Sequence, residues 1–383
     1  MKCTRKNRAV VSRPSRVPHR LRAGKVYAQM RATTRLRTAT PLAALAAAVG
    51  LLALTGCGPT GDDTERIAAG DGPQFPVFET DPDVPVLEDV VYGRAAGTDL
   101  LLDACLPPGS DSDDPDAAGA EADGLADSGN PGTGDTDPAE LPGASGTTAP
   151  RPAILLVHGG SWTRGDKADL AWRSTCQWLA NAGYVTFSAN YRLAPAHPFP
   201  AAIDDLERAV TWLRDPAQVE RFGLDPERIG AFGGSAGGNL VSLLATSGTG
   251  PTTEGTRVSA VVDLSGPIDL TGADATADFI PVQLQYLGCP EQAACPSART
   301  ASPIFHVDET DPPFFVAHSV DEFIPIAQSR RFVTALRDAG VDTTFVTLDG
   351  TLHSISMVDD ELRGRILEFL DSRLSGRLPG VVP

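Results

Sequence analysis

The segment Gly233-Gly234-Ser235-Ala236-Gly237 has the spacing G-x-S-x-G. It follows a short apolar run at 228–232 and precedes an amphipathic run at 236–245. This context predicts a sharp turn between a strand and a helix, with a serine at its tip. Glycines on either side let neighbouring backbone approach closely, and the N-terminus of the following helix favours negative charge. We therefore predict Ser235 as a nucleophile. The alternative is a purely structural glycine turn, since the chain contains 38 glycines.

A pair of glycines follows another strand-like run. His158-Gly159-Gly160-Ser161-Trp162 comes directly after the apolar residues 153–157. A serine nucleophile that attacks a carbonyl needs backbone N–H groups directed at the developing oxyanion, and a Gly-Gly turn can present them without side-chain obstruction. We predict Gly159, Gly160 and Ala236 as these donors.

Side chains around this turn have further predicted roles. His158 precedes the nucleophile in the chain and is expected to hold the turn through a hydrogen bond. Ser161 and Trp162 are candidates for contact with substrate. For Trp162, packing inside the domain is an equal alternative.

The general base should be a histidine, and the chain has six. His353 lies after the last strand-like run, 343–348, and before a C-terminal helical pattern, so it is the predicted base. The acid that orients it should follow the preceding strand-like run, 313–317. Asp321 is preferred over Glu322 because it lies nearer the end of that run, and Glu322 stays open as the alternative.

Short apolar runs alternate with longer amphipathic ones along the chain, and this predicts a mostly parallel sheet with helices on both faces. The strand candidates are residues 153–157, 184–189, 228–232, 259–264, 313–317 and 343–348. The helix candidates are residues 170–182, 201–213, 236–245, 326–339 and 359–374. Residues 86–91 and 100–106 are expected to add an antiparallel edge, and residues 266–303 to form a small cap over the site.

From about residue 86 to residue 375, these motifs resemble the α/β-hydrolase superfamily. Within it they are similar to bacterial esterases of the hormone-sensitive-lipase-like group and of the acetyl xylan and feruloyl esterase-like group. The matching stretches are HGGSW at 158–162, GDK at 165–167, NYRLAP at 190–195, HPFPA at 197–201, GLDPERI at 223–229 and GGSAGG at 233–238. The order Ser235, Asp321, His353 is the serine–acid–histidine order of the superfamily.

The resemblance implies the α/β-hydrolase fold and a serine ester hydrolase. Such an enzyme would act on acetyl or short- to medium-chain esters through an acyl-enzyme, with no metal or organic cofactor. Two departures are visible: the oxyanion turn has serine where the lipase group has a third glycine, and His318-Ser319-Val320-Asp321 is one residue shorter than the usual His-Gly-x-x-Asp. An amidase or formamidase with the same triad is one alternative. An inactive surface binding protein on a hydrolase scaffold is another.

The N-terminal segment has the features of an export signal. Residues 1–56 contain 12 Lys and Arg and no Asp or Glu, and residues 41–56 are uncharged and mostly apolar. They end in Leu54-Thr55-Gly56-Cys57, which resembles a bacterial lipobox. We predict a lipoprotein-type leader, with Met30 as an alternative start and with diacylglyceryl attached to Cys57 at the cell surface. An ordinary leader that releases the protein is the alternative.

The rest of the chain is acidic, with 49 Asp and Glu against 20 basic residues, which argues against nucleic acid and anionic bilayers as partners. Membrane contact is therefore expected only through the lipid anchor, and the predicted partner is a small ester. Residues 57–85 are predicted to be a flexible tether. Residues 86–378 are the predicted domain, interrupted by a disordered acidic loop at 108–149.

Four cysteines lie beyond the predicted lipidation site Cys57, and in an exported protein an even set suggests two disulfides. Cys289 and Cys295 flank a short loop, so they are the expected pair. Cys105 would then pair with Cys176. Reduced, buried thiols are the alternative, and no metal-ligand spacing with neighbouring histidines appears.

Overall fold

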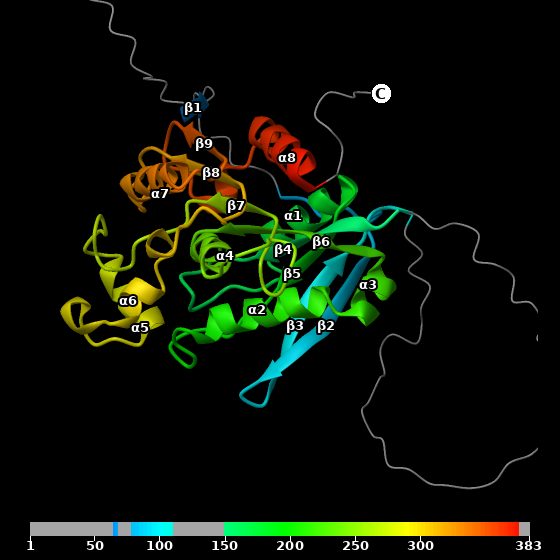
Figure 1. Ribbon diagram of the computed structural model, residues 1–383, viewed down its shortest axis with the longest axis horizontal. Helices are drawn as coiled ribbons and strands as arrows, with labels where there is room; N and C mark the ends of the chain where they lie inside the picture. Colours follow the sequence, from blue (N-terminus) through cyan, green and yellow to red (C-terminus); the bar gives the residue numbers. More distant parts are fainter. Residues whose placement is uncertain (1–63, 68–77, 110–148, 375–383) are drawn as a thin grey trace, which may run out of the picture. The chain divides into compact units, whose positions relative to one another are not determined.

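The computed structural model describes residues 64–67, 78–109 and 149–374 (Figure 1). The predicted leader, Cys57 and nearly all of the predicted acidic loop at 108–149 lie outside the described residues, as do most of the predicted tether and the last residues of the chain. Within the described residues, no helix is long and apolar enough to cross a membrane.

Nine strands of the described chain form one sheet, in the order β1-β9-β8-β7-β6-β4-β5-β3-β2. The strands are β1 (Thr64–Ile67), β2 (Val86–Ala95), β3 (Thr98–Cys105), β4 (Arg151–Val157), β5 (Val185–Ala189), β6 (Leu224–Gly234), β7 (Ala260–Leu264), β8 (Phe314–Ser319) and β9 (Thr343–Leu348). All neighbours from β1 to β5 are parallel, whereas β3 is antiparallel to β5 and to β2. The hairpin β2–β3 forms one edge of the sheet (Figure 1). The prediction of a mostly parallel sheet with an antiparallel edge is confirmed.

Helices cover both faces of this sheet. They are α1 (Leu170–Asn181), α2 (Ala201–Leu213), α3 (Pro216–Phe222), α4 (Ala236–Thr246), α5 (Ile280–Leu287), α6 (Ser297–Thr300), α7 (Ala327–Asp338) and α8 (Asp360–Leu374). In β4, Leu155 packs on the face that α2, α4 and α7 cover, and Ile154 packs on the face of α1 and α8. This alternation follows from the two-residue period of a strand and explains why β4 is apolar on both sides.

Helices α3, α5 and α6 and strand β1 were not predicted from the sequence. Helix α3 is short, but the Asp215 side chain caps it by accepting from the Ala217 N–H, and Gly223 ends it with φ of 61°. Strand β1 lies within the predicted tether and pairs in parallel with β9. Backbone hydrogen bonding to an open sheet edge does not depend on apolar side chains, so the composition of the tether gave no signal for β1.

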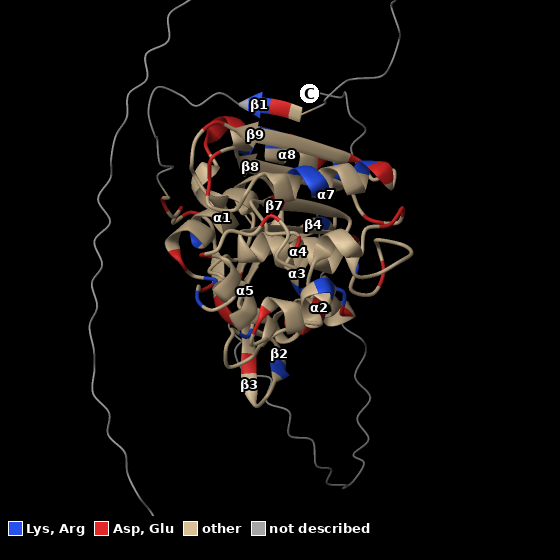
Figure 2. Ribbon diagram, turned by 90° about the vertical axis from the view of Figure 1, so that its left-hand side faces the viewer, with Lys and Arg blue, Asp and Glu red and all other residues tan. Residues whose placement is uncertain are grey.

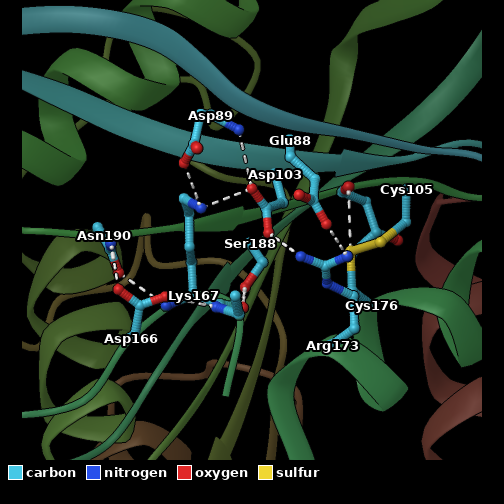
Figure 3. A network of polar contacts seen from close by, with 12 residues as sticks. Glu88, Asp89, Asp103, Cys105, Asp166, Lys167, Arg173, Cys176, Ser188 and Asn190 are labelled. Atoms are coloured by element: carbon cyan, nitrogen blue, oxygen red, sulfur yellow. Dashed lines mark hydrogen bonds and ion pairs between the residues drawn. A yellow bond between two sulfur atoms is a disulfide. The ribbon is translucent and has the colours of Figure 1, made fainter. Parts of the chain in front are cut away.

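The predicted disulfide pairing is confirmed. Cys105 and Cys176 are bonded and join β3 to α1, and the sulfur–sulfur bond is visible in Figure 3. Cys289 and Cys295 are bonded and close the short loop between α5 and α6. These two helices lie together at one side of the domain and form the small insertion expected at 266–303 (Figure 1).

Candidate active site

Ser235 lies at the tip of the turn between β6 and α4, as predicted. Its backbone has φ of 57° and ψ of −123°, a region that costs a non-glycine residue energy and is found at functional turns. Glycine is required at positions 233 and 237 because any side chain there would clash with neighbouring backbone. A side chain at Gly233 would place its Cβ 2.3 Å from the Gly237 carbonyl oxygen, and one at Gly237 would lie 2.1 Å from the Val157 carbonyl oxygen.

The Gly-Gly turn after β4 lies directly against this serine. A Cβ at Gly159 would be 3.2 Å from the Ser235 Cβ and 2.9 Å from the Gly234 carbonyl oxygen. Gly160 has φ of 117°, which disfavours any other residue there. Ala236 is the first residue of α4, so its amide belongs to the N-terminus of a helix. The structure thus places Gly159 and Ala236, two of the predicted oxyanion donors, beside Ser235, and Gly160 follows Gly159 in the same turn.

His158 supports the turn, as expected. Its ring is buried and stacks on Tyr191 with centroids 4.5 Å apart. Its Nδ1 lies 2.7 Å from the Gly159 carbonyl oxygen. Burial lowers the pKa of His158, so the ring is neutral at ordinary pH and serves as a packed hydrogen-bonding group.

Lys167 lies on the same loop and anchors it to strands β2 and β3 through ion pairs (Figure 3). Its Nζ lies 2.7 Å from Asp103 Oδ1 on β3 and 2.8 Å from Asp89 Oδ1 on β2. Its backbone N–H donates to Asn190 Oδ1 at 2.7 Å, and Ser188 Oγ donates to its carbonyl. Burial lowers the pKa of Lys167, but the two carboxylates outweigh this and raise it, so the ammonium stays charged. Sequence analysis assigned no role to this network.

His353 follows β9, on a loop that contacts the turn carrying Ser235. A Cβ at Gly234 would lie 2.1 Å from the Oγ of Ser354, so the histidine loop abuts the nucleophile turn. His353 Nδ1 donates to a carboxylate oxygen of Glu322, whose side chain is fully buried. His353 Nε2 has no hydrogen-bond partner among the described residues. The ring is therefore oriented on one side and free to take a proton on the other.

The prediction that Asp321 orients His353 is wrong. Asp321 is exposed, and its backbone N–H donates to the Gly350 carbonyl at 3.0 Å, whereas Glu322 contacts the histidine. Strand β8 continues to Ser319, two residues beyond its predicted end, so the next inward side chain belongs to Glu322. The motif His-Gly-x-x-Asp places the acid four positions after the histidine. Counted from His318, that position is Glu322, so the motif could have identified the acid.

A second histidine contacts Glu322. His318 is fully buried on β8, with Nε2 2.7 Å from Glu322 Oε1 and Nδ1 2.7 Å from Ser329 Oγ. Burial raises the pKa of Glu322, but the contacts with His318 and His353 outweigh it and hold this pKa below its usual value. Glu322 is therefore ionised at neutral pH. No role in the site was predicted for His318 from the sequence.

The residues predicted to contact substrate lie on the turn, but differ in exposure. Trp162 is only 1% exposed, stacks on Tyr286 of α5 at 4.4 Å and donates from Nε1 to Asn239 at 3.2 Å. Packing, the alternative for Trp162, is what the structure shows. Ser161 is half-buried with φ of 57°. In the described part of the chain, no cluster of three or more His, Cys, Asp or Glu side chains could hold a metal ion.

Comparison with known proteins finds related sequences. The BD-FAE family model matches residues 141–336. A probable carboxylic ester hydrolase, LipM, of Mycobacterium tuberculosis is 33% identical over 222 residues, covering 55% of this chain and 51% of LipM. The arylacetamide deacetylase of Bos taurus is 39% identical over 100 residues, covering 26% of this chain and 25% of that protein. The chain spans about half the length of the first curated relatives, or less.

Solved structures share the fold. A truncated carbohydrate esterase from gut microbiota has a TM-score of 0.58 at 20% identity, covering 77% of this chain and 99% of that one. An esterase of Thermogutta terrifontis has a TM-score of 0.53 at 22% identity, covering 76% and 91%. The α/β-hydrolase fold expected from the sequence is confirmed.

Proposed function

The chain belongs to the BD-FAE family, and we propose from this and from its site that it is a serine hydrolase of carboxylic esters. One observation carries the proposal: the strained Ser235 lies against Gly159, and the adjoining loop holds His353 on a buried, ionised Glu322. Ester hydrolases and esterases among the relatives support the same activity.

In the proposed mechanism, Ser235 Oγ attacks the ester carbonyl while His353 Nε2 takes its proton. Glu322 accepts from His353 Nδ1, which keeps the base in the required tautomer and stabilises the imidazolium that forms. The amides of Gly159, Gly160 and Ala236 would stabilise the tetrahedral oxyanion. His353 then donates its proton to the leaving alcohol, and water releases the acid from the acyl-enzyme by the same route.

We expect acetyl and other short- to medium-chain esters as substrates. The insertion around α5 and α6 is held in place by the Cys289–Cys295 disulfide and packs against Trp162 beside the Gly-Gly turn. We expect a small insertion that is cross-linked by a disulfide to leave limited room for a long acyl chain.

The proposal is tested by hydrolysis of p-nitrophenyl esters from acetyl to hexanoyl by residues 58–383. We expect turnover by the unmodified protein and a loss of about 10⁴-fold or more in kcat for Ser235→Ala. Ser372→Ala, on α8, is a matched control that should keep full activity. Equal activity in Ser235→Ala would remove this serine from the mechanism.

Amides are the second candidate class of substrate. An arylacetamide deacetylase is among the relatives, and the same serine, histidine and acid can cleave an amide. Acetanilide and a formamide therefore belong in the same panel. Turnover of these compounds without turnover of any ester would replace the esterase proposal.

We also propose that the protein is exported and anchored through lipid on Cys57. The lipobox-like Leu54-Thr55-Gly56-Cys57 supports this. The two disulfides support it as well, because such bonds persist mainly outside the reducing cytosol.

A further inference from the structure

Phe323 follows the acid Glu322 and lies beside the base. Its ring centroid is 4.4 Å from that of His353, with the rings inclined at 60°. Phe323 is 50% exposed, although it is a large apolar side chain, and the His353 side chain is 23% exposed. We propose that Phe323 is the binding surface for the alcohol part of the ester and that it selects alcohols carrying an aromatic ring. This inference rests on the proposed esterase activity.

Phe323 is the outer end of a continuous run of aromatic rings. Its ring contacts Phe279 at 5.9 Å, edge to face, and Phe279 contacts Trp162 at 6.2 Å. Trp162 in turn stacks on Tyr286. The run therefore extends from the catalytic histidine to the loop that carries Gly159 and Gly160. We call this run of rings, Phe323, Phe279, Trp162 and Tyr286, the aromatic wall.

The inner members of this wall have no free surface. Phe279 is 5% exposed, and Trp162 and Tyr286 are each 1% exposed. Phe323 is the member with an open face, so an incoming ring can extend the run only there. Aromatic pairs favour offset or edge-to-face contacts, and the run already contains both stacked and edge-to-face pairs.

The position of Phe323 assigns it to the alcohol rather than to the acyl group. In acyl transfer the histidine that takes the serine proton later donates it to the leaving alcohol. The alcohol oxygen must therefore lie within hydrogen-bonding distance of His353 Nε2. Whatever group that oxygen carries lies beside the histidine, where the exposed face of Phe323 is located.

The test compares benzyl acetate with ethyl acetate and cyclohexylmethyl acetate. The acyl group is the same in all three, and the cyclohexylmethyl ester matches the benzyl ester in size without a flat ring. We expect the unmodified protein to prefer benzyl acetate in kcat/KM. Phe323→Ala should lower the ratio of kcat/KM for benzyl acetate to that for ethyl acetate by about tenfold.

Two further variants keep the test informative if alanine harms folding. Phe323→Tyr retains the flat ring and should retain the ratio, whereas Phe323→Leu retains apolar volume and should lower it. Inhibition by benzyl alcohol, which measures binding without chemistry, should weaken in Phe323→Ala more than inhibition by cyclohexylmethanol.

An unchanged ratio in both Phe323→Ala and Phe323→Leu, with all three esters hydrolysed, would overturn the alcohol site and leave the esterase proposal intact. Absence of hydrolysis of every ester would overturn both. A monoacetylated methyl xyloside tests a sugar ring instead. A larger loss on that ester than on benzyl acetate in Phe323→Ala would overturn the choice of an aromatic alcohol.

Discussion

His353 binds a carboxylate through Nδ1 and leaves Nε2 without a partner among the described residues, so the identity of that carboxylate decides how the base is oriented. The candidates are adjacent in sequence but differ in environment. Glu322 is buried between two histidines, and Asp321 is exposed. A buried carboxylate that accepts from His353 and lies against His318 keeps a fixed position, which an exposed carboxylate does not.

Glu322→Gln should therefore lower kcat by about 10³- to 10⁴-fold, because an amide cannot hold His353 in the required tautomer or stabilise the imidazolium. Asp321→Asn is the matched control and should stay within about threefold of the unmodified protein, as expected for a surface change. Steady-state hydrolysis of p-nitrophenyl acetate measures both. The opposite pattern would return the role to Asp321.

The pH profile gives a second test, through His318. Contacts with His318 and His353 hold the pKa of Glu322 below its usual value, so its favourable charge is present at neutral pH and lost only as pH falls through that lowered pKa. His318→Phe removes one donor and should raise this pKa. The acid limb of kcat/KM should then move to higher pH.

His318→Gln keeps an N–H donor and should restore the profile toward that of the unmodified protein. A uniform loss of activity across pH in His318→Phe, with no movement of the acid limb, would limit His318 to a packing role.

Local spacing was enough to predict Ser235, His353 and Gly159, because each belongs to a short motif beside a strand end. It was not enough for the acid. Which of two adjacent residues turns inward depends on where β8 ends, and this is set by pairing with β7 and β9. Roles for His318 and Phe323 could not be predicted from the sequence, because they depend on contacts made in the folded protein. His318 contacts Glu322, and Phe323 contacts His353.

At the scale of elements, the loop between β4 and α1 carries the oxyanion turn, and elements distant in sequence hold it in place. Lys167 connects the loop to β2 and β3, while Ser188 and Asn190 fix its backbone at the end of β5. Asp89 has φ of 57° and lies at an irregularity in the pairing of β2, which directs its carboxylate at Lys167. The antiparallel hairpin thus supports the site as well as closing the sheet edge.

Lys167→Met should lower the free energy of unfolding by about 3 kcal/mol, because it leaves the fully buried Asp103 with one cation fewer. Arg173 still contacts Asp103, which limits the loss. Urea unfolding measures the effect. The double variant Lys167→Met/Asp103→Leu should recover part of it, since no unpaired charge then stays buried.

Arg94→Met is the matched control. Arg94 pairs with Asp99 on the same hairpin, but its side chain is 79% exposed, so the loss of stability should be much smaller than in Lys167→Met. Equal losses in Lys167→Met and Arg94→Met would mean that the buried network adds no particular stability.

At the scale of the whole molecule, the alternation of apolar and amphipathic runs was sufficient to predict the fold class and most of its elements. Strand β1 was missed because its contribution is a backbone ladder on β9, together with ion pairs of Glu65 with Arg365 and of Arg66 with Asp349. The surface of the described domain carries many acidic groups on its loops and helix ends (Figure 2). Such a surface is repelled by anionic headgroups.

Strand β1 also limits how far the domain can lie from an anchor on Cys57. Thr64 lies seven positions after Cys57 in the sequence. A fully extended chain of that length spans at most about 25 Å. If Cys57 is lipidated, the β1–β9 edge of the sheet therefore stays within that distance of the bilayer surface.

Expression of the full chain in a bacterial host tests the anchor. Cys57→Ala should move the protein from the detergent phase to the aqueous phase in a detergent partition and abolish incorporation of labelled fatty acid, because the attachment sulfur is lost. Cys3→Ala is the matched control: it removes a cysteine of the predicted leader and should leave both readouts unchanged. Retention of Cys57→Ala in the detergent phase would show that lipid at this residue does not anchor the protein.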